Sequence, residues 1–342
     1  MNSVKKEIKG DRKKTRREFL KTVSSFAGSA LILGKCSPDS DNGNEEPQEQ
    51  VLGPRIRIIN PFVTNTGRPI LVCVRGTDFV RMLQAGMEVL GGFGRLVGNR
   101  DVLVKPNLNH RDPYPGISSP DTIIDIVREV QQSSTGNIFV GDMGHETNVY
   151  AYLNLESLVT SAGATLLNFG EVYKVRRSTW ETGRPDFMVY SDVYDAPVII
   201  STCCLKRHLW ASLTCAIKSN VGCVNGPGAS GTRNYMHYQS QNFMQELAEI
   251  AGLINLELTI VDARSILTRG GPMIQDGTVV DGVNRIIICG DMVATDVYCG
   301  QLMETYDSTF SMSSIQETLQ HAQGLGLGVA DLNQVEVVEI ST

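Results

Sequence analysis

The sequence has eight cysteines but no C-x-x-C pair, and it has neither an H-E-x-x-H nor an H-x-H motif. Zinc sites and iron–sulfur clusters are usually built from these spacings, so neither is expected in its ordinary form. Any metal ligands would have to converge from loops that are distant in the sequence. A G-K-[ST] triplet is also missing, which excludes a P-loop in the glycine-rich segment 222–231.

Basic residues are scarce outside the N-terminus. Residues 1–36 hold ten Lys and Arg and three acidic residues, so the rest of the chain has 21 basic and 34 acidic residues, a net charge of −13. Nucleic-acid binding needs a basic footprint, and this class of function is therefore excluded. The hydrophobic content of 42% over 342 residues is enough to bury a large core.

The cysteines do not suggest a disulfide framework. Without Cys36, seven remain, an odd number that cannot all pair within the chain. Cys73 and Cys289 lie in apolar runs, as small buried hydrophobic residues do. The adjacent Cys203 and Cys204 could form a redox pair, but two buried thiols are the simpler expectation.

Residues 1–36 have the pattern of a targeting segment. A basic stretch leads to T-R-R-E-F-L-K at 15–21, and a mildly apolar run, 23–33, follows that is too short to span a bilayer. The motif resembles the bacterial twin-arginine export signal. We therefore expect the twin-arginine machinery to export this protein to the periplasm.

The segment after the signal is a candidate tether. L-G-K-C at 33–36 resembles a lipoprotein box with Cys36 as the acylated residue, although Lys35 stands where a small residue is expected. Residues 37–53 are polar, acidic and contain proline, which predicts a disordered linker. Membrane anchoring through Cys36 is left open. The folded domain is expected over residues 54–342.

Apolar strand-like runs alternate with helical patterns along this domain. The pattern predicts an α/β fold with a mainly parallel sheet and helices on both faces, and a small subsidiary lobe over 172–195. Strands are expected at 55–60, 70–75, 102–104, 138–140, 164–168, 198–200, 258–261, 285–289 and 335–340. Helices are expected at 78–90, with Asp78 as N-cap, and at 121–132, 151–162 and 242–253.

Five of these strands are followed by polar side chains. In a parallel sheet the carboxyl ends of strands meet at one edge, where α/β proteins bind ligands, so these side chains should share one cleft. They are Lys105 and Asn107, Asp142 with His145 and Glu146, Lys206 and His208, Asp262 with Arg264, and Asp291. Lys218 and Asn220 follow the third of these groups in the sequence.

The residue types in this predicted cleft suggest several roles. Lys206 and Lys218 could clamp an anionic substrate, or one could act as a base or Schiff-base nucleophile together with His208. A cofactor could be held by Lys105, Asn107, Asn220 and Asp291. Imidazole and carboxylate groups suit zinc, iron, nickel or manganese. The candidate metal ligands are Asp142, His145, His208, His237 and Asp262.

The order of short motifs resembles a bacterial and archaeal family, the "domain of unknown function" family 362. The motifs are V-L-V-K-P-N-L at 102–108, S-S-P at 118–120, G-D at 141–142, L-K-R-H at 205–208, T-C-A-I-K-S-N-V-G at 214–222, His237, V-D-A at 261–263, G-G-P at 270–272 and G-D-M-V-A-T-D at 290–296. The resemblance implies an α/β fold with a cleft lined by these motif residues, and some exported relatives carry a twin-arginine signal. It implies no particular reaction.

This sequence departs from the family pattern in two places. Many relatives carry ferredoxin-like cysteine clusters, which are missing here. Ser219 separates Lys218 from Asn220, where the family has the two adjacent. Two hypotheses therefore remain: a metal- or cofactor-dependent enzyme acting on a small anionic substrate, or a non-catalytic periplasmic protein that binds an anionic ligand or a metal.

Overall fold

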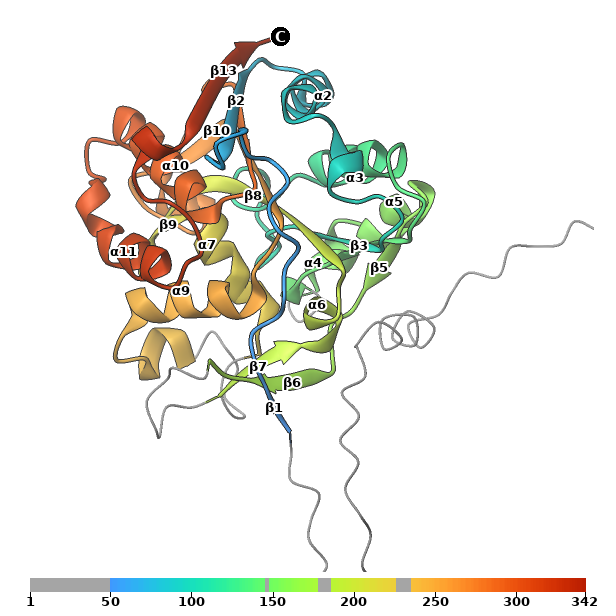
Figure 1. Ribbon diagram of the computed structural model, residues 1–342. Coiled ribbons are helices and arrows are strands. Elements are labelled where there is room, and N and C mark those ends of the chain that lie inside the picture. The colour runs from blue at the N-terminus through green and yellow to red at the C-terminus, as the bar shows by residue number, and fades with distance from the viewer. Residues whose placement is uncertain (1–49, 145–147, 178–185, 226–234) are drawn as a thin grey trace, which may run out of the picture. The chain divides into compact units, whose positions relative to one another are not determined.

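The computed structural model describes residues 50–144, 148–177, 186–225 and 235–342 (Figure 1). They belong to one compact unit, Glu49–Thr342. The export motif, Cys36 and most of the expected linker lie outside the described residues. None of the described helices combines the length and apolar character needed to cross a membrane.

The described residues contain a main sheet of ten strands. Eight of them lie in the order β13-β2-β12-β10-β8-β3-β4-β5, while β9 pairs with β8 and β11 pairs with β10. The bounds are β2 (Ile70–Arg75), β3 (Val102–Lys105), β4 (Ile138–Gly141), β5 (Thr165–Leu167), β8 (Val198–His208), β9 (Ser212–Thr214), β10 (Leu258–Thr268), β11 (Thr278–Val280), β12 (Arg285–Cys289) and β13 (Glu336–Ser341).

The eight strands of the main path run parallel except for one. β12 pairs antiparallel with both β10 and β2, whereas the other neighbours along the path pair parallel. The prediction of a mainly parallel α/β sheet is confirmed. The direction of β12 differs from the prediction, and it changes which side chains share an edge.

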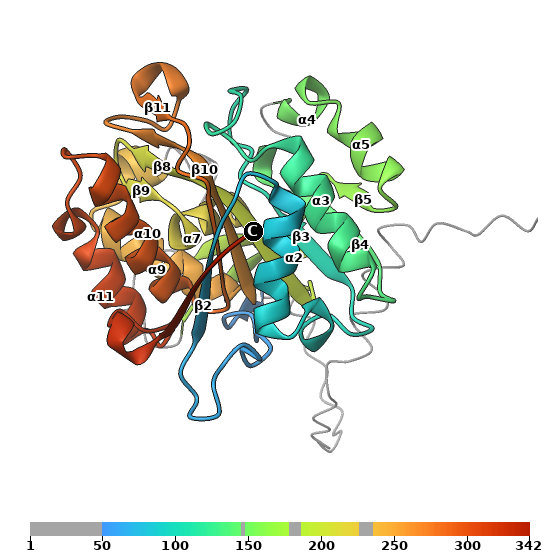
Figure 2. The same ribbon diagram turned by 90° about the horizontal axis from the view of Figure 1, so that it is seen from above.

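Helices cover both faces of this sheet (Figure 2). On one face lie α2 (Phe79–Leu90) and α3 (Pro120–Gln131), with α4 (Val149–Tyr152) and α5 (Leu155–Ser161) beside them. On the other lie α7 (Ala216–Ser219), α9 (Phe243–Ile254), α10 (Met292–Tyr306) and α11 (Gln316–Gly324). The single helix expected at 151–162 is two short helices, because Asn154 adopts a left-handed conformation between them.

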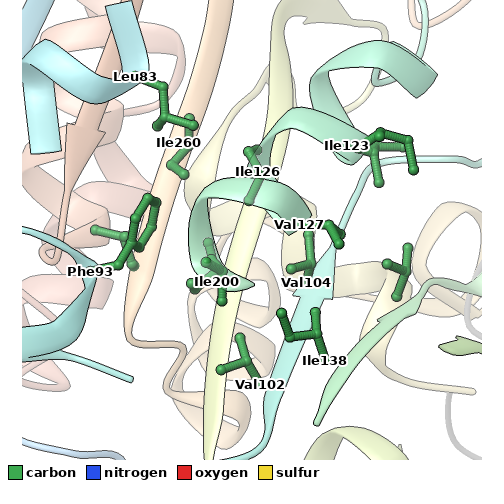
Figure 3. Close-up of a cluster of buried hydrophobic side chains, with 14 of the residues drawn as sticks. Leu83, Phe93, Val102, Val104, Ile123, Ile126, Val127, Ile138, Ile200 and Ile260 are labelled. Atoms are coloured by element: carbon green, nitrogen blue, oxygen red, sulfur yellow. The ribbon is translucent and has the colours of Figure 1, made fainter. Parts of the chain in front are cut away.

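The core beneath α2 and α3 follows from the sequence periodicity. Asp78 caps α2 by accepting a hydrogen bond from the Arg81 backbone N–H, as predicted. Buried α2 residues recur every three or four positions, so the helix buries one face. Figure 3 shows alternate strand residues, such as Val102 and Val104, pointing toward Ile126 and Val127 of α3.

A second, three-stranded sheet accounts for the subsidiary lobe. It consists of β1 (Val51–Leu52), β6 (Val172–Val175) and β7 (Phe187–Tyr190), and α6 (Ser191–Tyr194) follows β7. β1 lies inside the segment 37–53 that was expected to be a disordered linker, and it pairs with β6. Ordered structure therefore begins before residue 54.

Three strand predictions are wrong: the strand at 55–60, and the ends of β8 and β10, both of which run on past the predicted residue. Residues 55–60 form no strand. Arg55, in this segment, is buried and forms an ion pair with Glu257. Arg55 Nη1 lies 3.0 Å from Glu257 Oε1, and both side chains are at most 3% exposed. β8 does not end near residue 200 but continues to His208, so Cys203, Cys204 and Lys206 lie within the strand.

Candidate functional site

A cavity of about 170 Å³ lies where β3, β4 and β8 end. Its lining comes from the loop after β3, the end of β4, the end of β8, α7 with the following turn η3 (Asn220–Cys223), the π-helix η4 (Tyr235–Gln239), α9 and the loop after β10. Five of the predicted site residues line it: Asn107, Asp142, His208, Lys218 and His237. The structure thus brings together side chains that are up to 130 positions apart in the sequence.

A buried ion pair forms the floor of this site. Lys105 Nζ lies 3.0 Å from Asp142 Oδ1, and the two side chains are 0% and 1% exposed. Asp142 Oδ2 also accepts a hydrogen bond from the Leu108 backbone N–H at 2.6 Å. Burial by itself lowers the pKa of Lys105, but the charge and hydrogen bond of Asp142, together with the nearby Cys223 and Cys203, outweigh it, and the pKa lies above its usual value. Asp142 is therefore a carboxylate whose charge is already compensated.

Gly222 allows the turn η3 to pack against this ion pair. A Cβ at this position would collide with Asp142 Oδ1 and come within 3.1 Å of Lys105 Nζ. The K-S-N-V-G motif therefore combines two roles, because Lys218 lines the cavity and Gly222 leaves room for the pair. Asn220 lies between them, and its Nδ2 donates to the carbonyls of Ala216 and Ile217 at 2.9 and 3.1 Å.

Asn220 and Lys105 do not reach the cavity lining. Asn220 is fully buried and caps α7, so it supports Lys218 rather than lining the cavity itself. Lys105 lies directly behind Asp142. They could therefore affect a bound cofactor only indirectly, Asn220 through Lys218 and Lys105 through Asp142.

The backbone fixes the ring of His208. Its Nδ1 accepts hydrogen bonds from the backbone N–H groups of Trp210 and Ala211 at 3.2 and 3.1 Å. A neutral imidazole that accepts at Nδ1 carries its proton on Nε2, so this nitrogen is a donor. The His237 ring lies 6.0 Å from that of His208, centroid to centroid, and stacks on Trp210 at 5.6 Å with an interplanar angle of 17°.

Lys206 is buried behind the cavity. It is 0% exposed and donates a hydrogen bond to the Gly116 carbonyl. Burial lowers its pKa from 10.5 to about 8. Lys206 is therefore a lysine that can exchange a proton close to neutral pH.

His110 and Asn109 also line the cavity, although neither was among the predicted site residues. Burial, followed by the positive charge of Lys206, lowers the pKa of His110 from 6.5 to about 4, so the ring is neutral at pH 7. Its Nδ1 lies 3.4 Å from Asp112 Oδ2. Their place in the sequence could have identified them as site residues, because both follow Asn107 in the loop after β3.

Asp262 does not lie in this cavity. It is inside β10, which continues to Thr268 instead of ending at Val261. Its carboxylate pairs with Arg264 at 2.7 Å and accepts from Tyr114 and Thr122 at 2.7 and 2.9 Å. Because the predicted end of the strand was wrong, so was the expectation that Asp262 shares the cleft.

Asp291 lies at the opposite edge of the sheet. It follows β12, whose antiparallel direction places Cys289 beside Thr259 at the start of β10. Its carboxylate caps α10, accepting from the backbone N–H groups of Val293 and Ala294 at 3.0 and 2.8 Å. The expectation that Asp291 joins the cleft is wrong, because it assumed that every strand runs the same way.

The described donors do not fit a metal ion. Within residues 50–144, 148–177, 186–225 and 235–342, no group of three or more His, Cys, Asp or Glu side chains is placed to hold one. His208 Nδ1 is engaged by two backbone groups, and the charge of Asp142 is compensated by Lys105. His145 and Glu146 lie outside the described residues.

Comparison with known proteins adds a family and two similar proteins. The family model described as domain of unknown function (DUF362) matches residues 102–301. A thylakoid-associated protein of Synechocystis sp., sll1697, is 26% identical over 246 residues, which cover 69% of this chain and 74% of that protein. The lactate racemase apoprotein from Thermoanaerobacterium thermosaccharolyticum has a TM-score of 0.39 and 11% identity, covering 69% of this chain and 57% of that one. That likeness is too low to support an inference about function.

Proposed function

The chain belongs to the family of the domain of unknown function DUF362, and we propose that its cavity binds a small anionic molecule. The observation that carries the proposal is the set of polar side chains on the cavity lining, where Lys218 lies with His208, Asn107 and Asn109. Cationic and hydrogen-bond-donating side chains together bind carboxylate and phosphate groups.

The polar groups of the lining suit such a ligand. Lys218 supplies a positive charge, His208 a ring N–H, and Asn107 and Asn109 amide groups. These groups come from the end of β8, the loop after β3 and the short helix α7, and the ring of His208 is held by two backbone N–H groups, which favours a preorganised site. Lys218 therefore acts as the charge partner of the anion, and the other groups orient it.

We also propose that the protein acts on the bound anion as an enzyme. Neutral His110 and Lys206, with pKa values of about 4 and about 8, are neighbours whose protonation states differ at pH 7. Such a pair suits general acid–base chemistry, with His110 in the lining and Lys206 acting through it. The alternative is a periplasmic protein that binds the anion without converting it, for which no titrating pair is needed.

A metal-dependent version of this enzyme would need ligands beyond the described set. Asp142 and His237 could contribute only together with residues such as His145 and Glu146. Metal analysis of protein purified from the periplasm tests this version, and a stoichiometric transition metal would support it.

Calorimetric titration of the full-length protein with acetate and inorganic phosphate tests the anion site. Lys218→Met keeps most of the side-chain volume and removes the charge, so it should weaken binding at least about tenfold, as loss of a close charge pair does. Lys174→Met, on β6 in the three-stranded sheet, is the matched control and should bind like the unaltered protein. Unchanged binding by Lys218→Met would show that this cavity is not the anion site.

The acid–base proposal has its own readout. An anion bound near Lys206 raises the pKa of its ammonium group, so binding at pH 8 should take up a fraction of a proton. Titration in buffers of different ionisation enthalpy measures this uptake, which Lys206→Met should abolish. Binding without proton uptake would favour the non-catalytic alternative.

We also propose that the twin-arginine machinery exports the protein to the periplasm. The support is the T-R-R-E-F-L-K motif at 15–21. Anchoring through Cys36 is the finer version of this proposal, and the intact mass of the mature protein tests it by the presence or absence of a lipid adduct.

A further inference from the structure

The loop between β3 and α3, residues 106–119, supplies three residues of the cavity lining, Asn107, Asn109 and His110. Within residues 106–119 no helix or strand forms. The loop is therefore positioned by hydrogen bonds that its side chains and backbone make to the rest of the domain. Those bonds decide where the three lining residues lie.

The two ends of the loop are closed on each other. The Asn107 N–H donates to Ser118 Oγ at 2.9 Å, and the Ser118 N–H donates to the Asn107 carbonyl at 3.0 Å. Ser118 Oγ in turn donates to the Thr202 carbonyl of β8 at 3.1 Å. These bonds fix Asn107. Asn109 and His110 lie further along the loop, so their positions depend on contacts nearer its middle.

Tyr114 fastens the middle of the loop to β10. Its hydroxyl donates to Asp262 Oδ1 at 2.7 Å and accepts from the Ser265 backbone N–H at 2.9 Å. The pairing of β10 with β8 shifts register between Asp262 and Leu267, so residues 263–266 have no paired residue on β8. Tyr114 thus satisfies a backbone group that the ladder with β8 leaves out.

Two further contacts support the same part of the loop. Asp112 Oδ2 accepts from the Ile274 backbone N–H at 2.7 Å, and Lys206 Nζ donates to the Gly116 carbonyl. Ile274 begins the short 3-10 helix η5 (Ile274–Asp276) and belongs to a loop itself. Tyr114 differs from Asp112 because its hydroxyl reaches a strand of the main sheet directly.

Asp262 is itself held in place. Arg264 donates to it twice, from Nε to Oδ1 at 3.0 Å and from Nη2 to Oδ2 at 2.7 Å, and Thr122 Oγ1 donates to Oδ2 at 2.9 Å. The Arg264 guanidinium also lies over the Tyr114 ring, 5.7 Å from its centroid. Asp262 is 1% exposed. A buried, charge-paired carboxylate has a fixed position, and the hydrogen bond that it accepts from Tyr114 is charge-assisted.

We infer that Tyr114 and Asp262 are positioning residues of the cavity. Asp262 orients the Tyr114 hydroxyl, and Tyr114 holds Asn109 and His110 at the cavity wall. Asp262 lies outside the lining, so it acts on the site through this loop. The effect on anion binding rests on the proposed anion site, whereas the effect on the His110 ring does not.

Tyr114→Phe removes the hydroxyl and keeps the ring. NMR of the full-length protein with carbon-13-labelled histidine follows His110, whose signals His110→Asn assigns. They should shift, and the pKa of His110 should rise from about 4 toward 6.5, because a loop released from β10 exposes the ring to water. Lys206, Lys218 and Asp112 also act on this pKa, and the variant keeps all three. An unaltered His110 ring in Tyr114→Phe would overturn the inference.

Matched variants separate positioning from general damage to the fold. Tyr152→Phe, at an exposed tyrosine of α4, should leave the histidine spectrum unchanged, and the signals of His321 on α11 report that the domain stays folded. Asp262→Ala should reproduce the change at His110, whereas Asp262→Asn keeps an oxygen for the Tyr114 hydroxyl and should restore most of the original signal. A normal His110 ring in Asp262→Ala would also contradict the inference.

Calorimetric titration with acetate and inorganic phosphate measures the consequence for binding. Tyr114→Phe should weaken binding of both anions about three- to tenfold, the range that one hydrogen bond contributes. Unchanged affinity in Tyr114→Phe would overturn the link between this anchor and the anion site. If the unaltered protein bound neither anion, the anion site would be refuted, and the His110 spectrum would still decide whether Tyr114 positions the cavity wall.

Discussion

Gly222 leaves no room for a side chain beside the buried ion pair of the site. Gly222→Ala would place a methyl group against the buried pair of Asp142 and Lys105, so we expect it to destabilise the protein by about 1–3 kcal/mol, as overpacking does. Gly324→Ala, at the end of α11 where a Cβ meets nothing within 4 Å, is the control and should not destabilise. Urea denaturation measures both, and equal stability of the two variants would contradict this packing.

His110 should make stability depend on pH. Its folded pKa of about 4 lies below the ordinary value of 6.5, so between these values the unfolded chain binds more protons than the folded one. The contribution of the neutral ring is therefore complete above about pH 6.5 and is lost as the pH falls toward 4. Compared with His110→Asn, the unaltered protein should lose stability over this window. Parallel stability curves would contradict the burial of a neutral His110.

At the scale of elements, the direction of β12 assigns a structural role to Asp291. Asp291→Ala should cost about 0.5–2 kcal/mol by removing the N-cap of α10. It should leave anion affinity unchanged, because Asp291 lies at the other edge of the sheet. Asp291→Asn keeps an accepting oxygen and should lose less. Thermal unfolding and phosphate titration measure the two effects, and weaker anion binding would place Asp291 in the site after all.

For the whole molecule, export is the property that the folded domain does not reveal. Arg16→Lys together with Arg17→Lys should hold the protein in the cytoplasm, because the twin-arginine receptor reads the arginine pair. Lys13→Arg with Lys14→Arg keeps the same net charge and is the control. Cell fractionation followed by immunoblotting measures the distribution, and normal periplasmic recovery of the double lysine variant would refute this route.

Local pattern was enough to predict much of this fold and part of the site. Alternating apolar strands and amphipathic helices such as α2 predicted the α/β class, because burial of one face depends only on side-chain periodicity. Asn107, Asp142 and His208 were predicted to meet because each stands at the carboxyl end of a strand. Those three strands do run parallel, so the general rule held for them.

The remaining features depend on neighbours that are distant in the chain. The antiparallel pairing of β12 removed Asp291 from the site, and the continuation of β10 past Val261 moved Asp262 to the face covered by α3. Burial and nearby charge lowered the pKa of His110, whose one sign in the sequence was its place after Asn107 in the loop that follows β3. By itself the sequence determined the class of fold and the edge where polar strand ends gather. Only the tertiary structure decided strand direction, charge pairing and burial, because each depends on contacts between segments far apart in the sequence.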